Sequence, residues 1–116
     1  MEGYIDEYGQ ARVNIAIIGR KMEITVRPVI DTGFDGDICL PLPMAIQLGL
    51  ELSGSVEIEL ADGSIKQELV FSGVTKFGEE VKKARITLTE STDALMGTQM
   101  FSYLEIDFEG NKVRVK

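Results

Sequence analysis

The sequence predicts an all-β protein, a compact barrel or sandwich of many short strands with one short helix. Apolar and polar residues alternate with period two through much of the 116-residue chain, and β-branched residues are frequent in those segments. Only one segment is typical of a helix, and turn signals separate the strands. The chain contains no internal repeat or linker, so residues 1–116 are expected to form a single domain.

The individual elements follow from this pattern. Residues 43–49 form the expected helix, because Pro43 suits a first helical turn and Gly49 stands where a helix stops. A turn at 19–21 separates the first two strands. The expected strands are residues 12–17, 22–26, 37–40, 56–60, 65–69 and 81–89.

A hairpin is expected in the middle of the chain. Asp62-Gly63 lies between two alternating segments, and this dipeptide favours a two-residue turn in which both residues have positive φ. With that loop, the register pairs Leu60 with Ile65 and Glu59 with Lys66.

A second hairpin is expected at the C-terminus, with Gly110-Asn111 as its loop. This register places three opposite-charge pairs on one face and two apolar pairs on the other. A slip of one residue on either strand would destroy both sets. The predicted pairs are Glu109–Lys112, Phe108–Val113, Asp107–Arg114, Ile106–Val115 and Glu105–Lys116.

Charge and composition limit the partners. The formal net charge is −7 and the basic residues are scattered, which argues against a nucleic-acid partner. No apolar run approaches the roughly 18 residues of a membrane span. Residues 1–7 are acidic where a secretory signal is basic, so a cytoplasmic location is expected. The single cysteine, Cys39, cannot form an internal disulfide and is expected to be a buried, inert thiol.

The chain contains no histidine, which restricts its chemistry. Ser-His-Asp and Cys-His catalysis both need imidazole as the base, and zinc sites built on histidine are excluded as well. Carboxylates, lysine and tyrosine remain for acid–base chemistry near neutral pH. We expect no metal ion and no cofactor.

Residues 31–37 carry the most chemistry. Three carboxylates and two glycines lie there between apolar segments. A calcium loop of the EF-hand type fails, because its third and twelfth positions would be Gly33 and Leu42. A plain acidic turn is one interpretation. The flanking apolar strands would, however, hold the carboxylates rigidly and partly desolvated, as enzymes do to tune carboxylate pKa values.

Several motifs resemble those of the aspartic peptidases. Residues 29–33, Val-Ile-Asp-Thr-Gly, are similar to the active-site signature of that family, and Leu40-Pro41 with residues 45–50 resembles small stand-alone retropepsin-like proteins. Residues 94–97, Ala-Leu-Met-Gly, match the hydrophobic-hydrophobic-Gly motif downstream. The hairpin tipped by Asp62-Gly63 stands where the family has its flap. The resemblance covers roughly residues 11–110.

The resemblance implies a retropepsin-like closed β-barrel with one short helix that acts as a two-fold homodimer. Asp31 of each subunit would form a dyad sharing one proton and activating a water for hydrolysis of a peptide bond. One Asp-Thr-Gly per chain makes a two-fold axis the simplest source of the second carboxylate. Thr32 would hydrogen-bond across the axis, and Gly33 would allow the tight turn.

An extended peptide would bind between flap and floor like an added strand. Asp35 would contact the substrate backbone, although a solvated turn residue is an equal alternative. Cleavage is expected at sites flanked by apolar residues. The expected substrate-binding residues are Asp35, Phe34, Asp62, Gly63, Leu95, Met96 and Gly97, and Ile30 is a further candidate; core packing is the alternative role for Ile30, Phe34, Leu95 and Met96.

The sequence departs from retroviral members of the family at two positions beside these motifs. Phe34 replaces a small residue, and Thr98 stands where those members carry an arginine. The expected flap has a single glycine, Gly63. An alternative function is therefore a catalytically weak peptide-binding or dimerisation module with the same fold.

Overall fold

The computed structural model describes residues 1–116 and contains twelve strands, one α-helix and one 3₁₀ turn. In chain order these are β1 (Glu2–Ile5), β2 (Ala11–Arg12), β3 (Ile15–Ile18), β4 (Glu23–Val26), β5 (Val29–Ile30), β6 (Ile38–Pro41), α1 (Leu42–Leu48), β7 (Glu51–Glu59), β8 (Ile65–Phe77), β9 (Glu80–Thr89), β10 (Leu95–Met96), η1 (Thr98–Met100), β11 (Leu104–Asp107) and β12 (Lys112–Val115).

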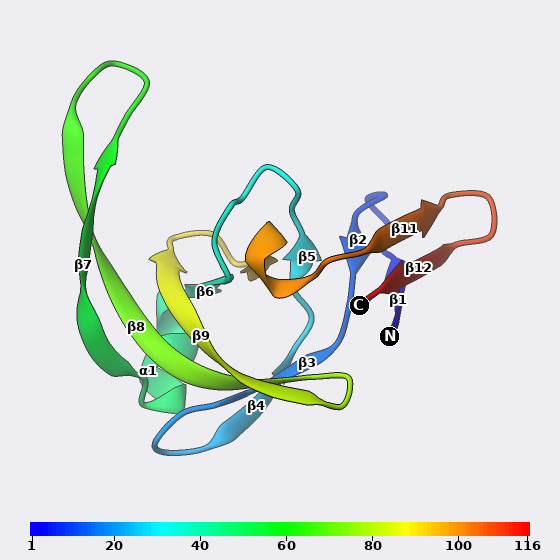
Figure 1. Cartoon of the computed structure of the whole chain (residues 1–116), viewed down its shortest axis with the longest axis horizontal. Helices are drawn as coiled ribbons and strands as arrows, with labels where there is room; N and C mark the ends of the chain where they lie inside the picture. The colour runs from blue at the N-terminus through cyan, green and yellow to red at the C-terminus, as the bar shows by residue number, and fades with distance from the viewer.

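The expected class, mostly β with one short helix, is confirmed, but the expected closed barrel is wrong. The strands pair in the order β11-β12-β1-β2-β5-β10-β6-β9-β8-β3-β4, and β7 pairs only with β8. The β7–β8 hairpin projects from the body as a long arm (Figure 1). No strand joins β11 to β4, so the sheet stays open.

The core lies within the curved sheet and under α1. Seventeen buried residues form one apolar cluster. Period-two alternation supplies much of it: Ile15 and Ile17 of β3 are buried while their neighbours are half-buried. The helix contributes Ala45 and Leu48 and ends at Gly49, which adopts φ 68° and closes the last turn. Each fully buried Ile or Leu contributes roughly 1.5–3 kcal/mol of apolar transfer free energy.

The middle hairpin forms, but its predicted register is wrong by one residue. Glu59 pairs with Ile65, not with Lys66. The loop is one residue longer, because Gly63 donates its N–H to the Leu60 carbonyl and Leu60 donates to the Ser64 carbonyl. Gly63 alone takes a positive φ of 84°, as in a type I turn closed by a glycine bulge. Asp62 stabilises this turn by accepting hydrogen bonds from the backbone and hydroxyl of Ser64.

The C-terminal hairpin also forms, with its register shifted by two residues from the prediction. A shift of two keeps every side chain on its predicted face, so Ile106 still faces an apolar partner, Val113 instead of Val115. Phe108 falls in the loop and is exposed. The loop is stabilised by Asp107, whose carboxylate accepts the Gly110 N–H. The observed pairs are Leu104–Val115, Glu105–Arg114, Ile106–Val113 and Asp107–Lys112.

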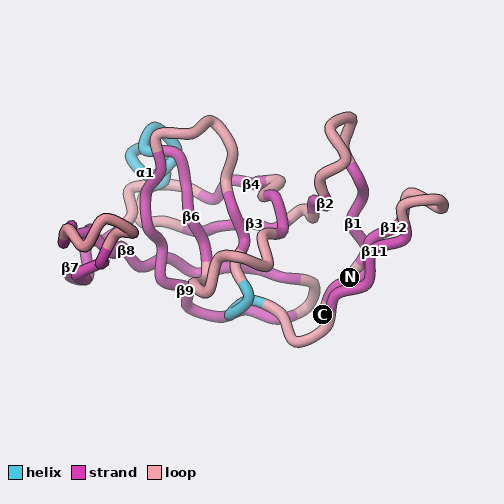
Figure 2. The backbone as a smooth tube through the Cα atoms, turned by 90° about the horizontal axis from the view of Figure 1, so that it is seen from above, coloured by secondary structure: helices cyan, strands magenta, loops and turns pink.

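The hairpin arm and the chain termini lie at opposite ends of the molecule. The β7–β8 arm lies at one end, and β1, β11 and β12 lie at the other with both termini (Figure 2). The N-terminal ammonium donates to the Val115 carbonyl at 2.8 Å. β1 was not expected from the alternation pattern, and the expected strand 12–17 is interrupted between β2 and β3.

Candidate active site

The loop at residues 31–37 lies over one end of the three neighbouring strands β5, β10 and β6. β5, which precedes the loop, pairs in parallel with β10, and β6, which follows it, pairs with β10 from the other side. The loop therefore crosses over the end of β10. Asp31 is tied to this strand directly, since its N–H donates to the Met96 carbonyl at 2.9 Å. Two distant motifs of the sequence, residues 29–33 and 94–97, thus form one structural unit.

Three further backbone hydrogen bonds hold the loop against the chain that follows β10. Gly97 donates to the Asp37 carbonyl at 2.8 Å, Thr98 to the Phe34 carbonyl at 2.9 Å and Gln99 to the Gly36 carbonyl at 3.2 Å. Glycine is required at residue 97, because a Cβ there would overlap the Gly36 carbonyl oxygen. The loop is consequently fixed at both ends and along its length.

Asp31 is half-buried and oriented by its own turn. Its Oδ1 accepts the N–H of Gly33 at 2.9 Å, and its backbone carbonyl accepts the N–H of Phe34 at 3.2 Å. The other carboxylate oxygen has no hydrogen-bond partner within the chain. Thr32 and Gly33 are exposed beside it. One oxygen is thus held in place, while the other is available to a water, a substrate or a second subunit.

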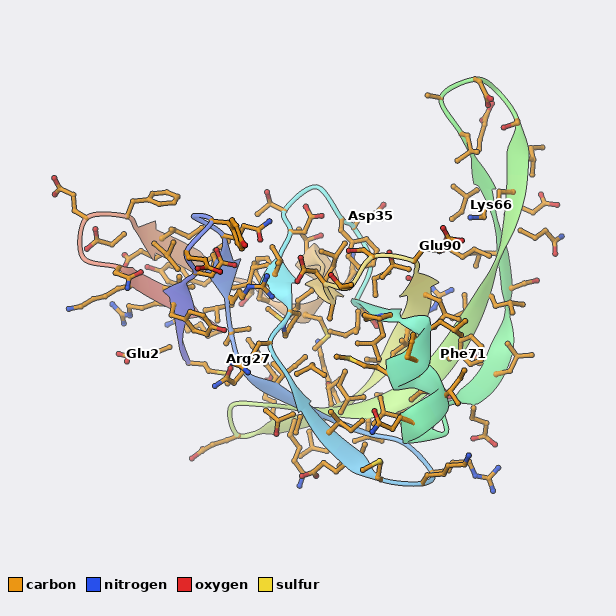
Figure 3. The ribbon with its side chains drawn as sticks, turned by 180° about the vertical axis from the view of Figure 1, so that it is seen from behind. Glu2, Arg27, Asp35, Lys66, Phe71 and Glu90 are labelled. Carbon is orange, nitrogen blue, oxygen red and sulfur yellow. The ribbon has the colours of Figure 1, made fainter.

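A groove of about 820 Å³ separates this loop from the projecting hairpin. The loop and the hairpin extend to the same side of the body (Figure 1), and Figure 3 shows Asp35 on the loop and Lys66 on the hairpin. The volume of the groove suits several residues of an extended peptide. The groove is lined by Asp31, Gly33, Phe34, Asp35, Gly36, Asp37, Ile38, Cys39, Val56, Ile58, Glu68, Val70, Arg85, Thr87, Leu95 and Gln99.

The structure brings some of the expected site residues into this groove and leaves others outside it. Asp31, Gly33, Phe34, Asp35 and Leu95 line it. The rest do not: Thr32 is exposed beside the groove, Gly97 is buried under the loop, Met96 and Ile30 belong to the apolar core, and Asp62 and Gly63 lie exposed at the hairpin tip.

The hairpin strands supply groove residues that the sequence analysis missed. Val56 and Ile58 of β7 and Glu68 and Val70 of β8 face the groove. The alternation of these strands was visible in the sequence, but both faces carry apolar residues, including the exposed Ile65 and Leu69 on the outer face. Hydrophobicity alone could not indicate which face is turned inward.

Acidic side chains outnumber basic ones in the groove, and they differ in what they contact. Asp37 accepts the backbone N–H of Arg85 at 2.8 Å, which joins the loop to β9. Asp35 is exposed on the loop.

The Cys39 thiol on the groove floor is buried, and this burial raises its pKa, so the thiol stays protonated near neutral pH. No group of three or more histidine, cysteine or acidic residues is arranged to hold a metal ion.

A half-buried arginine joins the segments that lead into β5 and β10, at the strand ends opposite the Asp31 loop. The Arg12 guanidinium contacts Asp6 at 2.6 Å and Asp93 at 3.0 Å, and it also donates to the Arg27 carbonyl at 2.8 Å. Arg27 and Asp93 each lie two residues before a strand of the parallel pair β5–β10. The hydrogen bond from Arg12 also lowers the pKa of Asp6. This cluster therefore fixes the spacing of the two strands that carry Asp31 and Gly97.

The fold matches that of a solved protein over nearly the whole chain. A crystal structure of a retropepsin-like aspartic protease from Rickettsia conorii aligns with 99% of this chain and 88% of that chain, with a TM-score of 0.66 and 17% sequence identity. The fold is retropepsin-like. The sequence itself matches no protein-family model and no curated protein. None of the helices is both long and apolar enough to span a membrane.

One carboxylate of the expected signature, that of Asp31, lies at the edge of the groove. Asp31 has an oxygen without a partner and opens onto a groove with apolar walls. A carboxylate so placed can accept a proton from a water molecule, and its half-buried position strengthens its interaction with charges that develop during a reaction. A single subunit supplies no second carboxylate from an equivalent turn.

Proposed function

We propose that the protein is a homodimeric aspartic endopeptidase in which Asp31 of each subunit forms the catalytic dyad. The observation that carries this proposal is the turn of Asp31, held by the parallel β5–β10 pair at the edge of a peptide-sized groove. The likeness to the Rickettsia conorii protease supports the fold on which it rests.

The second carboxylate has no good source within the same chain. The Asp37 carboxylate is engaged by the Arg85 N–H, and Asp35 stands on the exposed part of the loop. A two-fold axis beside the exposed Thr32 would bring two copies of the Asp31 turn together. Thr32 of each subunit could then bond to the opposite loop and hold the two carboxylates at a fixed separation.

The chemistry follows from two carboxylates that share one proton, since two like charges at that distance cannot both ionise. The ionised carboxylate takes a proton from a water molecule, whose oxygen attacks the peptide carbonyl carbon. The protonated partner donates a hydrogen bond to the carbonyl oxygen and later supplies a proton to the leaving amine. The C–N bond breaks, and the shared proton is restored when the products leave.

The substrate would be an extended peptide or an unfolded segment. One edge of β7 pairs with no other strand, and residues of β7 line the groove together with the loop at 31–37, so we expect backbone pairing to hold a strand-like ligand. Phe34 and Leu95 on one side and Val56, Ile58 and Val70 on the other form apolar walls. We therefore expect apolar side chains beside the cleaved bond.

A mixed peptide library tests this function directly. The protein is incubated with it at mildly acidic and neutral pH, beside Asp31→Asn and, as a matched control from the same loop, Asp35→Asn. Cleavage that Asp31→Asn abolishes and Asp35→Asn retains at least in part supports the proposal. Absence of cleavage by a folded, dimeric protein would instead favour the peptide-binding or dimerisation module.

A further inference from the structure

One charged side chain stands on an otherwise apolar stretch of the groove wall. Glu68 of β8 pairs with Val56 of β7, and both face the groove together with Ile58 and Val70. Glu68 is half-buried, whereas Glu57 on the outer face of the same hairpin is exposed. The hairpin therefore presents one carboxylate to the groove, with Val56 and Val70 beside it and Lys66 as its neighbour toward the tip.

This carboxylate has no cationic partner in the chain. None of the ion pairs of the structure involves Glu68. Arg85, the one basic residue that lines the groove, stands opposite Ser72, whose backbone is four residues or about 13 Å along β8 from that of Glu68. Lys66 pairs with the groove-lining Ile58 and therefore shares the face of Glu68, but it lies toward the hairpin tip, is exposed and does not line the groove. A charge on an apolar wall is costly unless a partner compensates it.

Glu68 and Cys39 line the same groove, Cys39 on its floor. Burial raises the pKa of the Cys39 thiol most, a hydrogen bond with Thr87 lowers it, and the negative charge of Glu68 raises it further. Because Cys39 also lines the groove, a ligand seated between floor and hairpin would pass within reach of the Glu68 carboxylate.

Building on the proposed function, we propose that Glu68 determines specificity by binding a lysine or arginine side chain of the substrate. The aliphatic stem of such a side chain would lie against Val56 and Val70, and its charged head would pair with the carboxylate. A carboxylate suits this role, since an apolar pocket alone would favour an aliphatic side chain over a lysine, whose charge is costly to desolvate without a partner.

The overall charge of the protein favours the same class of substrate. The formal net charge is −7, and four acidic residues but one basic residue line the groove. Such a field accelerates the approach of basic peptides and disfavours acidic ones. Specificity would then combine apolar residues beside the cleaved bond with one basic residue under the hairpin.

The test measures binding separately from catalysis by using Asp31→Asn protein. Fluorescein-labelled peptides with one apolar core carry lysine, arginine, norleucine or glutamate at each position in turn, and fluorescence anisotropy gives their dissociation constants. At one position lysine or arginine should bind on the order of 10-fold tighter than norleucine, as expected of a charge-assisted contact in a partly desolvated site. Adding Glu68→Gln should remove this preference, and Glu68→Lys should reverse it toward glutamate.

Two controls keep the result interpretable. Glu57→Gln removes a carboxylate from the outer face of the same hairpin and should leave the preference unchanged. Binding of the norleucine peptide reports whether the Glu68→Gln groove is intact. A preference for basic residues that survives Glu68→Gln, or the absence of any such preference, overturns the inference.

The outcome is distinguishable from failure of the proposed function. Cleavage by the unsubstituted protein without a preference that depends on Glu68 would overturn the role of Glu68 and leave the peptidase in place. Binding with that preference but without cleavage would support the role of Glu68 in a peptide-binding module. Absence of binding by every peptide would overturn the inference whatever the library experiment gives.

Discussion

Gly97 packs directly against the backbone of Gly36, so closely that a Cβ at residue 97 would overlap the Gly36 carbonyl oxygen and lie 2.7 Å from the Phe34 carbonyl oxygen. The contact joins the chain after β10 to the loop that carries Asp31. Backbone atoms on both sides leave little room for adjustment. The position of the Asp31 loop relative to the sheet therefore depends on the absence of a side chain at residue 97.

We predict that Gly97→Ala destabilises the fold by about 1–3 kcal/mol, because overpacking here must displace backbone. Gly73→Ala is the matched control. Its Cβ would meet the end of the Ile86 side chain at 2.9 Å and the end of the Leu50 side chain at 3.1 Å, and both can move. Urea unfolding of the two variants measures the difference. Equal losses of stability would show that the Gly36 contact does not constrain residue 97.

The Asp6–Arg12 contact predicts a specific pH dependence of stability. Arg12 lowers the pKa of Asp6 in the folded state, so this contribution is fully present above the unfolded pKa of about 4 and is lost as pH falls through the folded pKa. Asp6→Asn should be less stable than the unsubstituted protein at pH 7, and the gap should narrow as the pH falls below about 4. Urea midpoints across this range test it, with the exposed Glu7→Gln as control. A gap of constant size at all pH values would contradict the assignment.

The burial of Cys39 predicts slow alkylation. Because burial raises the pKa of its thiol, the thiolate is scarce near neutral pH, and the side chain is also shielded by the groove floor. Reaction with iodoacetamide should be at least roughly tenfold slower in the folded protein than in urea. Mass spectrometry of timed samples gives both rates. Similar rates would show that the groove floor opens in solution.

The hairpin tip predicts a local effect without a global one. Gly63 adopts φ 84°, which costs an alanine about 1 kcal/mol or more, but the tip packs against no core residue. In Gly63→Ala the tip can open locally and relieve this strain without unfolding the body, so hydrogen exchange of the amides near the tip should become faster while the urea midpoint falls by less than that cost implies. A large fall of that midpoint would mean that the arm is coupled to the core more strongly than its contacts indicate.

The local patterns of the sequence predicted the elements better than their pairing. The helix that ends at Gly49 and the strand alternation of β9 follow from spacing and turn residues alone. The registers of the two hairpins could not be predicted from spacing and turn residues, because side chains stabilise their loops. Asp62 bonds to Ser64 and Asp107 bonds to Gly110, and each bond lengthens a loop that the glycine dipeptide alone would keep to two residues.

The candidate site was accessible to sequence analysis where a motif marks it. Asp31 and Gly97 lie in short signatures whose resemblance to a family indicated that they belong together. Glu68 lies in no such motif. Its contribution depends on which face of the hairpin is turned toward the groove, and that is decided by tertiary packing rather than by the alternation of the strand.

Subunit mixing tests the central claim, that each of two subunits supplies one Asp31. Unsubstituted and Asp31→Asn proteins are unfolded and refolded together at varied ratios, with constant total protein and a tag on one partner to measure mixed dimers. At equal amounts about a quarter of the dimers carry two intact Asp31 residues, so cleavage should fall to about a quarter of that of the unsubstituted protein. Cleavage of about half would show that each subunit acts alone and would contradict the dyad.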